Sequence, residues 1–411
     1  MVDMTERFFP SRTAHGAPSA GNVGHAGGLA FSAGPLSAGL METYARLVAS
    51  APAGPAQRPE WLAAWSRDVN PDCILAMAHK GEDLVLAVPL EIVREGPFRI
   101  ARAPGGSHAN GNFFAASPAF DQAPDAAGRL RSAFRAVAAA RPDIDLIVLE
   151  RLSLRLDGAD NPLAALPHAD SPNVALAADL AGGFEALVDR MSGKRKRKKY
   201  RSQLRKFEAA GGYRCLRAET PEEVTRLLSA LYAMKEERFR KMGIADVFGP
   251  AEIKTFFGDL FTAALKEPEP RFFLSGLEVG GKLRAVAGYS RTAGRIICDF
   301  TSFAEDELYV ASPGEFLFFH DIEQACASAV RIFDFSVGDE TYKRAWCEIE
   351  TRQFDVLVPL TAKGHAAAAI RRTKARAKNF VKNNPAVWRL ARMVRARNAA
   401  KPEPAGKSDQ D

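Results

Sequence analysis

The chain has 411 residues, enough for two or three ordinary domains, and its 47% apolar and 26% charged residues are typical of a globular protein. Its apolar runs are shorter than the roughly 18 residues that span a bilayer, and no charged start followed by an apolar stretch marks a secretory signal. The five cysteines form no Cys-x-x-Cys pair, so a zinc site and a disulfide framework are not indicated, and a reducing, cytoplasmic location is expected.

The net charge of +7 is concentrated in two segments. Residues 194–206 contain nine Lys and Arg and no acid, and residues 356–401 contain twelve and no acid. Acidic residues outnumber basic ones in the rest of the chain. Local basicity of this kind indicates either a solvated helix or a surface that binds phosphates or anionic lipid.

The first 34 residues are rich in Gly, Ala, Ser and Pro, and we expect them to form a disordered tail. Alternating and helical patterns begin after this tail. The elements expected next are helices starting near Ser37 and after Pro59, a hairpin of strands 73–80 and 84–93 around Gly81, strands at 98–101 and 112–115, a helix at 124–140 and a buried strand at 144–149.

A similar order recurs in the second half of the chain. Its expected elements are a helical region at 184–209 stopped by Gly211 and Gly212, a strand at 213–217, helices at 220–242 and 250–265, a hairpin of strands 271–279 and 283–291 around Gly281, a strand at 296–303, a helix opening at Ser312 and a strand starting at Phe333. Gly81 and Gly281 take matching places, and each closing strand has an Asp near its start, Asp145 or Asp334.

This repeat of pattern predicts two similar units. We place them at residues 35–180 and 181–360, with a basic linker helix at 184–210 in the second unit and a basic amphipathic tail at 361–411.

The order strand, two helices, hairpin, strand, helix, strand within residues 192–360 resembles the GNAT acyltransferase fold. The motifs that carry the resemblance are the basic helix 194–206, Glu237-Arg238-Phe239, Ser312-Pro313-Gly314 and the run from Phe333 to Lys343. Together they are similar to the Fem-type and cellulose-biosynthesis CelD-like branch, whose members carry two GNAT-like units. The resemblance implies an α/β fold with a mixed (α+β) sheet and two tandem GNAT-like domains, of which the second is expected to be active.

The same resemblance implies transfer of an acetyl or other acyl group from acyl-CoA to an amine or hydroxyl of a sugar, polysaccharide or envelope precursor. The usual phosphate-binding signature, a basic or Gln residue before a Gly-x-Gly/Ala turn, is replaced by Leu308 to Glu315. Fem-type relatives take aminoacyl groups from charged tRNA, so a tRNA-dependent transferase is one alternative. A non-catalytic component of polysaccharide biosynthesis is another.

The segment Ser312-Pro313-Gly314-Glu315 is the candidate binding site for the acyl-CoA phosphates. A helix N-terminus presents unpaired N–H groups and a partial positive charge, and Gly314 lets a ligand approach the backbone. Phe303, at the end of the preceding strand, is assigned to the same cofactor-binding site. The alternative is a capping box, with Ser312 as N-cap and Glu315 three residues on.

Acyl transfer to an amine requires a general base and stabilisation of an oxyanion. Asp299 lies on a largely apolar strand and is the candidate base, with an edge-facing or salt-bridged Asp as the alternative. Tyr342 is the candidate donor to the leaving group, Lys343 the partner of phosphate or oxyanion, and Asp339 the contact for an acceptor amine. Polar groups just beyond a strand end often line sites in α/β folds. The alternative for this last segment is a plain helix start.

Arg238 is the candidate substrate contact for an anionic acceptor, and a solvated helix face is its alternative. The histidines, His108 among them, show no partner spacing, so core or surface roles are expected. The sequence contains no metal-binding motif of the His-Glu-x-x-His kind, and no metal is expected.

The basic segments 194–206 and 363–401 are candidates for binding tRNA or an anionic membrane surface. Residues 385–394 alternate apolar and Arg positions as an interfacial helix does, so peripheral association with the inner membrane accompanies the expected cytoplasmic location. A helix that packs back on the domain is the alternative.

Overall fold

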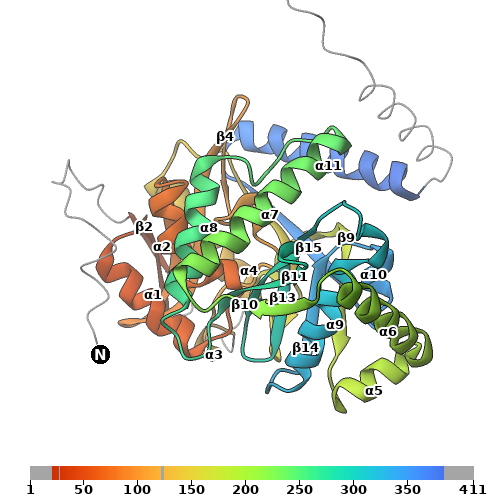
Figure 1. Ribbon diagram of the computed structural model, residues 1–411. Coiled ribbons are helices and arrows are strands. Elements are labelled where there is room, and N and C mark those ends of the chain that lie inside the picture. The colour runs from red at the N-terminus through yellow and green to blue at the C-terminus, as the bar shows by residue number, and fades with distance from the viewer. Residues whose placement is uncertain (1–20, 27, 122–124, 384–411) are drawn as a thin grey trace, which may run out of the picture.

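The computed structural model describes residues 21–26, 28–121 and 125–383, which form two units joined in one sheet (Figure 1). The first unit contains β1 (Gly21–Ala26), β2 (Leu29–Pro35), α1 (Ala38–Ser50), α2 (Pro59–Asp68), β3 (Cys73–Lys80), β4 (Asp83–Glu95), β5 (Phe98–Arg102), α3 (Pro118–Asp121), α4 (Ala126–Ala140), β6 (Leu146–Ser153), the short β7 (Arg155–Leu156) and β8 (Ala159–Asp160), and β9 (His168–Asp179).

The second unit contains α5 (Gly183–Arg190), α6 (Gly193–Ala209), β10 (Tyr213–Arg217), α7 (Pro221–Met242), α8 (Ala251–Ala264), β11 (Phe272–Val279), β12 (Lys282–Arg291), β13 (Arg295–Phe303), α9 (Pro313–Cys326), β14 (Ile332–Val337), α10 (Thr341–Arg344) and β15 (Ile349–Pro359), followed by α11 (Ala362–Asn383). Single 3-10 turns are η1 (Pro55–Gln57), η2 (Gly106–His108), η3 (Pro162–Ala165) and η4 (Tyr309–Ala311).

The units exchange their last strands. The order of the 13-stranded sheet is β1-β2-β3-β4-β5-β6-β15-β9-β14-β13-β12-β11-β10. Strand β9, from the first unit, therefore pairs with β14 of the second, and β15, from the second, pairs with β6 of the first. The two exchanged strands also pair with each other in antiparallel fashion. A boundary at residue 180 thus divides the chain but not the sheet, because each unit is completed by a strand of the other.

Strand register confirms the repeat seen in the sequence. Each unit has an antiparallel hairpin with an irregularity near its turn, then a parallel pair, β5 with β6 and β13 with β14. The hairpins close at Lys80↔Asp83 and Val279↔Lys282, so Gly81 corresponds to Gly280 rather than to Gly281. Both glycines have positive φ, 61° and 56°, which the tight turns require.

Helices cover both faces of the sheet. In the first unit α4 packs over β1–β3 and α1 packs over β4. In the second unit α9 and α7 both pack over β11–β13, and each helix belongs to a different apolar cluster. Trp61 and Trp65 of α2 contact Phe256 of α8, with ring centroids 4.9 and 5.0 Å apart. The cluster around α7 and α8 therefore includes side chains of both units, which fixes one unit against the other.

Three expectations from the sequence are wrong in part. The segment expected as a disordered tail contains β1 and β2, and Phe31 of β2 is fully buried; residues 1–20 lie outside the described chain. The linker helix expected at 184–210 is two helices, because Ser192 takes φ 67° and ends the regular hydrogen bonding between α5 and α6. Residues 112–115 do not form a strand, and within this range only Asn112 makes an isolated bridge, to Leu152.

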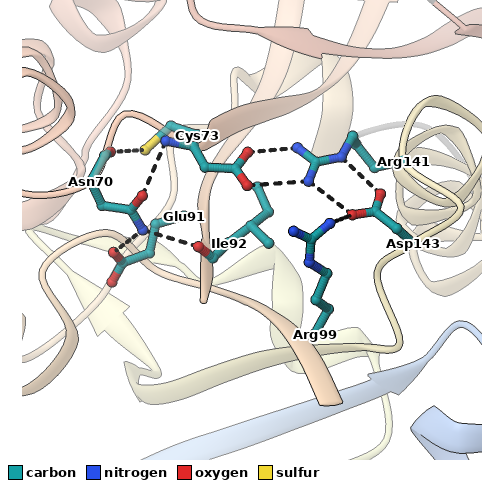
Figure 2. A network of polar contacts seen from close by, with 8 residues as sticks. Asn70, Cys73, Glu91, Ile92, Arg99, Arg141 and Asp143 are labelled. Atoms are coloured by element: carbon teal, nitrogen blue, oxygen red, sulfur yellow. Dashed lines mark hydrogen bonds and ion pairs between the residues drawn. The ribbon is translucent and has the colours of Figure 1, made fainter. Parts of the chain in front are cut away.

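A polar network ties β3, β4 and β5 to the start of β6 in the first unit (Figure 2). Arg141, just after α4, donates from Nη1 to Asp72 at 2.6 Å and from Nε to Asp143 at 2.9 Å, and Arg99 also pairs with Asp143. These bonds to Arg141 and Arg99 hold the pKa of Asp143 down at about 2. The network fixes the connection between α4 and β6, on which the parallel strand pair depends.

Helix α11 packs back on the sheet. Ala367 and Ala368 are buried against β5 and β6, and Arg371 pairs with Glu95 and, at 3.2 Å, with Glu150. This contact supports the packing alternative for the start of the basic tail, whereas residues 385–394, where an interfacial helix was expected, lie outside the described chain. No helix within residues 21–26, 28–121 and 125–383 has the length and apolar character needed to cross a membrane.

Candidate functional site

A cavity of about 830 Å³ opens where β13 and β14 separate. The two parallel strands pair only at Arg295↔Ile332, Ile296↔Phe333 and Ile297↔Asp334. Beyond this point β13 continues to Phe303 beside β12, while β14 ends at Val337. The edge of β13 from Cys298 onward is thus turned to the cavity instead of to a strand. A volume of this size matches the usual range of small-molecule sites.

Five parts of the chain line this cavity. They are β13, the C-terminal half of α7 with the following loop, η4 with the start of α9, the end of β14 with α10, and η2 of the first unit. Eight of the ten residues predicted as site residues are among its lining: Arg238, Asp299, Phe303, Ser312, Gly314, Glu315, Tyr342 and Lys343. Pro313 and Asp339 are not among the described lining residues.

The N-terminus of α9 faces the cavity without a side-chain cap. Ser312 has φ 56° and ψ 63°, and its hydroxyl makes no capping hydrogen bond in the described chain. Glu315 pairs with Lys199 of α6 rather than bonding back to the helix start. The capping-box interpretation is therefore wrong. Pro313 is buried at the first helical position, where it has no N–H to donate.

Gly314 lets Phe303 lie against the start of α9. A Cβ atom at Gly314 would come within 3.1 Å of Cδ1 of Phe303, so this position has little room for a side chain. Arg238 of α7 lies over the same ring, with its guanidinium carbon 5.2 Å from the centroid of Phe303. Residues predicted from separate motifs thus meet around one aromatic ring.

Asp299 lies in the wall of the cavity on β13. Burial raises the pKa of its carboxyl to about 8, and the carboxylate of Asp334 acts in the same direction. No cationic side chain of the described chain lies within ion-pair distance of Asp299, so the salt-bridged alternative does not apply. A carboxyl with a pKa near neutrality is suited to accept a proton from an attacking group.

Tyr342 and Lys343, in the segment after β14, have different roles. Tyr342 lines the cavity and stacks on Phe318 of α9, with centroids 5.6 Å apart, and burial raises the pKa of its phenol well above the ordinary value. The phenol therefore stays protonated and can donate. Lys343 is buried and donates to the Val337 carbonyl at 2.7 Å and to Glu340 at 3.0 Å, which holds the end of β14.

Asp339 is placed away from the cavity. Its carboxylate pairs with Arg344 at 2.5 Å on the surface. The geometry therefore gives Asp339 a part in fixing α10, and it does not bring this residue together with the others predicted to be catalytic.

The lining also includes polar residues that the sequence analysis did not assign to a site, among them Lys235, His108 and Asn110. Lys235 precedes Arg238 by three positions on α7, and this helical spacing could have indicated it. His108 and Asn110 come from the first unit, and no local signal in the sequence links them to β13. Within the described residues, no group of three or more His, Cys, Asp or Glu side chains is placed to hold a metal ion.

Comparison with known proteins agrees with this architecture. Residues 194–344 match the family model described as an acetyltransferase (GNAT) domain, which is less than half of the chain. No curated protein matches the chain. The second unit thus contains a region that matches a GNAT domain, and the expected α/β fold of two tandem GNAT-like units is confirmed.

Several solved structures are similar to this chain at low sequence identity. The crystal structure of FemX matches with a TM-score of 0.53 and 10% identity, over 79% of this chain and 97% of that chain. L-PGS from Bacillus licheniformis matches with a TM-score of 0.46 and 12% identity, over 81% and 95%. A tandem GNAT protein from the clavulanic acid biosynthesis pathway matches with a TM-score of 0.38 and 13% identity, over 80% and 99%.

Proposed function

We propose that the protein is an acyltransferase that moves an acetyl or related acyl group from acyl-CoA to an amine or hydroxyl. The observation that carries the proposal is the cavity between β13 and β14, where the uncapped start of α9 and the half-buried Asp299 face the same space. The matched GNAT domain includes all of these residues.

The donor would bind along the open edge of β13, with its phosphates at the start of α9. Ser312, Gly314 and Glu315 form this helix end. The N–H groups of Ser312 and Glu315 donate to the Tyr309 and Ser312 carbonyls, so the Gly314 N–H and the helix dipole are what the backbone offers to an anion. Phe303 would support the donor from β13. Because Pro313 cannot donate, the hydroxyl of Ser312 is the additional donor that this end offers.

The chemical step follows from the groups around the cavity. Asp299 takes the proton of the acceptor while its nitrogen or oxygen attacks the thioester carbonyl, and backbone N–H groups on the open edge of β13 stabilise the oxyanion. The carbon–sulfur bond then breaks, and Tyr342 donates its proton to the departing thiolate. Solvent returns a proton to Tyr342 and removes one from Asp299, so acyl transfer is complete without a covalent enzyme intermediate.

The acceptor in this proposal is a sugar, polysaccharide or envelope precursor. The support is the resemblance of the motifs from residue 194 to residue 343 to the Fem-type and CelD-like branch. A cytoplasmic protein with peripheral membrane contact through its basic segments would fit such a precursor.

The experiment is thiol release by the full chain with acetyl-CoA and longer acyl-CoA donors across a panel of aminosugars and polyols. Calorimetric binding of CoA is measured beside it. We expect donor binding in the wild type and in the Asp299→Asn variant, and thiol release in the wild type alone. If no acyl-CoA binds and none releases thiol with any acceptor, the CoA donor is wrong.

A second candidate donor is aminoacyl-tRNA, which one specific feature favours. Helix α6 and η4 border a groove of about 340 Å³ whose lining includes Arg195, Lys198, Lys199 and Lys206, and Val310 belongs to both this groove and the larger cavity. A phosphate backbone in this groove would reach the start of α9. This donor predicts tRNA binding that weakens steeply with salt and that is lost on changing Arg195, Lys198 and Lys206 to Gln. Equal tRNA binding by wild type and triple variant would exclude it.

A further inference from the structure

One corner of the cavity contains two cations without acidic partners. Lys235 and Arg238 lie one helical turn apart on α7, and neither has a carboxylate within ion-pair distance among the residues that the structure describes. Lys235 Nζ is 5.2 Å from the ring centroid of Phe248 and 5.6 Å from that of Phe239. The third Lys or Arg among the described lining residues, Lys343, is paired with Glu340.

The acids of the cavity leave this positive charge uncompensated. Glu315 pairs with Lys199, and Glu340 pairs with Lys343. Burial raises the pKa of Asp299 to about 8, so its carboxyl is mostly neutral at neutral pH. The local excess of charge is therefore positive, and aromatic rings around Lys235 reduce the screening by water.

The first unit contributes polar groups to the same cavity through η2 and the residues that follow. Asn110 Oδ1 accepts from Nη1 of Arg151 at 2.8 Å, so its amide nitrogen is the group left to donate. His108 Nε2 lies 3.1 Å from the Val247 carbonyl, which can only accept, so the ring proton is on Nε2. Burial lowers the pKa of His108 to about 4, and the ring is neutral at neutral pH. Both residues are thus compatible with an anion beside Lys235.

We propose that the acceptor carries an anionic group, a carboxylate or a phosphate, that binds to Lys235 and Arg238 of the second unit with Asn110 of the first unit as a further donor. The inference rests on the proposed acyltransferase function and specifies the chemical class of its acceptor. The apolar rings of Phe239 and Phe248 would contact the part of the acceptor next to this group.

This assignment gives a reason for an unpaired lysine in the partly apolar cavity, where Lys235 is half-buried while Arg238 stays exposed. A lysine that loses water without gaining a partner is destabilising, and burial together with the charge of Arg238 lowers the pKa of Lys235 to about 8. A bound anion would provide the missing partner. It would also place the acceptor between α7 and β13, on which Asp299 lies.

The test uses the full chain and three small probes of similar shape: phenyl phosphate, benzoate and benzamide. Calorimetry measures their binding to the wild type and to the Lys235→Met, Arg238→Gln and Asn110→Ala variants. Arg240→Gln is the matched control, because Arg240 is an exposed cation on the same helix that does not line the cavity. Circular dichroism and the thermal midpoint of each variant show whether it is folded.

We expect one or both anionic probes to bind the wild type and the Arg240→Gln variant, and benzamide to bind at least about tenfold more weakly. Lys235→Met and Arg238→Gln should each weaken binding by about tenfold or more, and Asn110→Ala by about threefold. Preference for benzoate or for phenyl phosphate then identifies the anionic group as a carboxylate or a phosphate.

Three results would overturn the proposal. They are equal binding of benzamide and the anions, equal binding by the Lys235→Met and Arg240→Gln variants, and complete displacement of the anions by saturating CoA, which would assign these cations to the donor. Anion binding that depends on Lys235 in a protein that neither binds nor consumes acyl-CoA would leave the anion site standing and remove the CoA donor. The reverse pattern would remove the anion site alone.

Discussion

The two units share one order of strands and helices, yet the gap between their parallel strands is filled in the first unit and open in the second. In the first unit β5 and β6 pair at three positions, Ile100↔Leu146 to Arg102↔Val148, just as β13 and β14 do. After these positions the chain of residues 103–112 turns back into the gap. Asn112 bonds to the backbone of Glu150 and Arg151, and Arg151 donates to the Ser107 carbonyl at 3.2 Å and to Asn110.

One position shows how the sequence produces this difference. By strand register, the place that Asp299 has on β13 corresponds to Pro104 after β5. Proline cannot continue the ladder, and Gly105 with φ 110° turns the chain away, so β5 ends at Arg102. In the second unit the strand continues to Phe303 and keeps an acid facing the cavity. The loop that fills the first gap also supplies His108 and Asn110 to the second.

Helices α4 and α9, which take the same place in the two units, also differ at their N-termini. Asp125 before α4 and Ser312 before α9 have nearly the same backbone angles, φ 56° and ψ 60° against φ 56° and ψ 63°. Asp125 accepts from the N–H of Gly128 at 2.9 Å and places a carboxylate at the helix end, whereas the Ser312 hydroxyl makes no such bond. The comparison teaches that the first unit contributes structure to its neighbour, whereas the second unit keeps the N-terminus of α9 uncapped beside the cavity.

The largest expected effect is on catalysis, from Asp299→Asn. If Asp299 is the base, the variant should bind acyl-CoA normally and lose about 10²- to 10⁴-fold in turnover, measured as thiol release. Wild-type activity should rise as pH increases toward about 8, because the carboxyl must be ionised to act and burial raises its pKa to about 8. Unchanged turnover would show that the acid absent from the first unit is also dispensable in the second.

The same raised pKa makes stability depend on pH in the opposite direction to activity. The raised pKa of Asp299 means that folding takes up a proton between the unfolded pKa of about 4 and the folded value of about 8, so its contribution to the free energy of unfolding falls as pH rises through that window. Asp299→Asn should remove this decline and leave the variant more stable than the wild type at pH 8. Urea unfolding at pH 5 and pH 8 measures the difference.

The next effect tests the strand exchange. Phe354 of β15 is buried in the core of the first unit, so Phe354→Ala should lower the free energy of unfolding by about 3–5 kcal/mol. Arg352→Ala is the control on the same strand, because Arg352 is largely exposed and should change stability by less than about 0.5 kcal/mol. A cost below about 1 kcal/mol for Phe354→Ala in urea unfolding would mean that the first unit holds its core without β15.

A smaller effect is expected when the N-terminus of α9 is given a carboxylate like the one that caps α4. Ser312→Asp should place a carboxylate at the start of α9, as Asp125 does at α4, and weaken CoA binding by about tenfold through repulsion of its phosphates. Ser312→Asn has the same shape without the charge and should weaken binding much less. If calorimetry gives the two variants equal affinities, the open helix end is not the phosphate site.

The smallest effect is expected at α4, the corresponding helix of the first unit. Asp125→Ala should cost about 1 kcal/mol of unfolding free energy through loss of the cap on α4. Acyl transfer at saturating substrate should be unchanged, because α4 packs over β1, β2 and β3, which are many strands away from β13 and β14 in the sheet order. Asp125→Asn keeps the capping oxygen and serves as the control. A loss of activity without a loss of stability would assign the first unit a catalytic part.

The sequence by itself determined the local elements and their repetition. Periodicity, the Thr220-Pro221 start of α7 and the turn glycines specified helices and hairpins, because these signals act over a few residues. Motif positions also indicated most of the residues that meet at the cavity. Only the tertiary structure decided that β9 and β15 change places, that Pro104 leads a loop into one gap, and that Lys235 and Asn110 line the same cavity. Those features depend on which strand edges pair across hundreds of residues, and no local pattern carries that information.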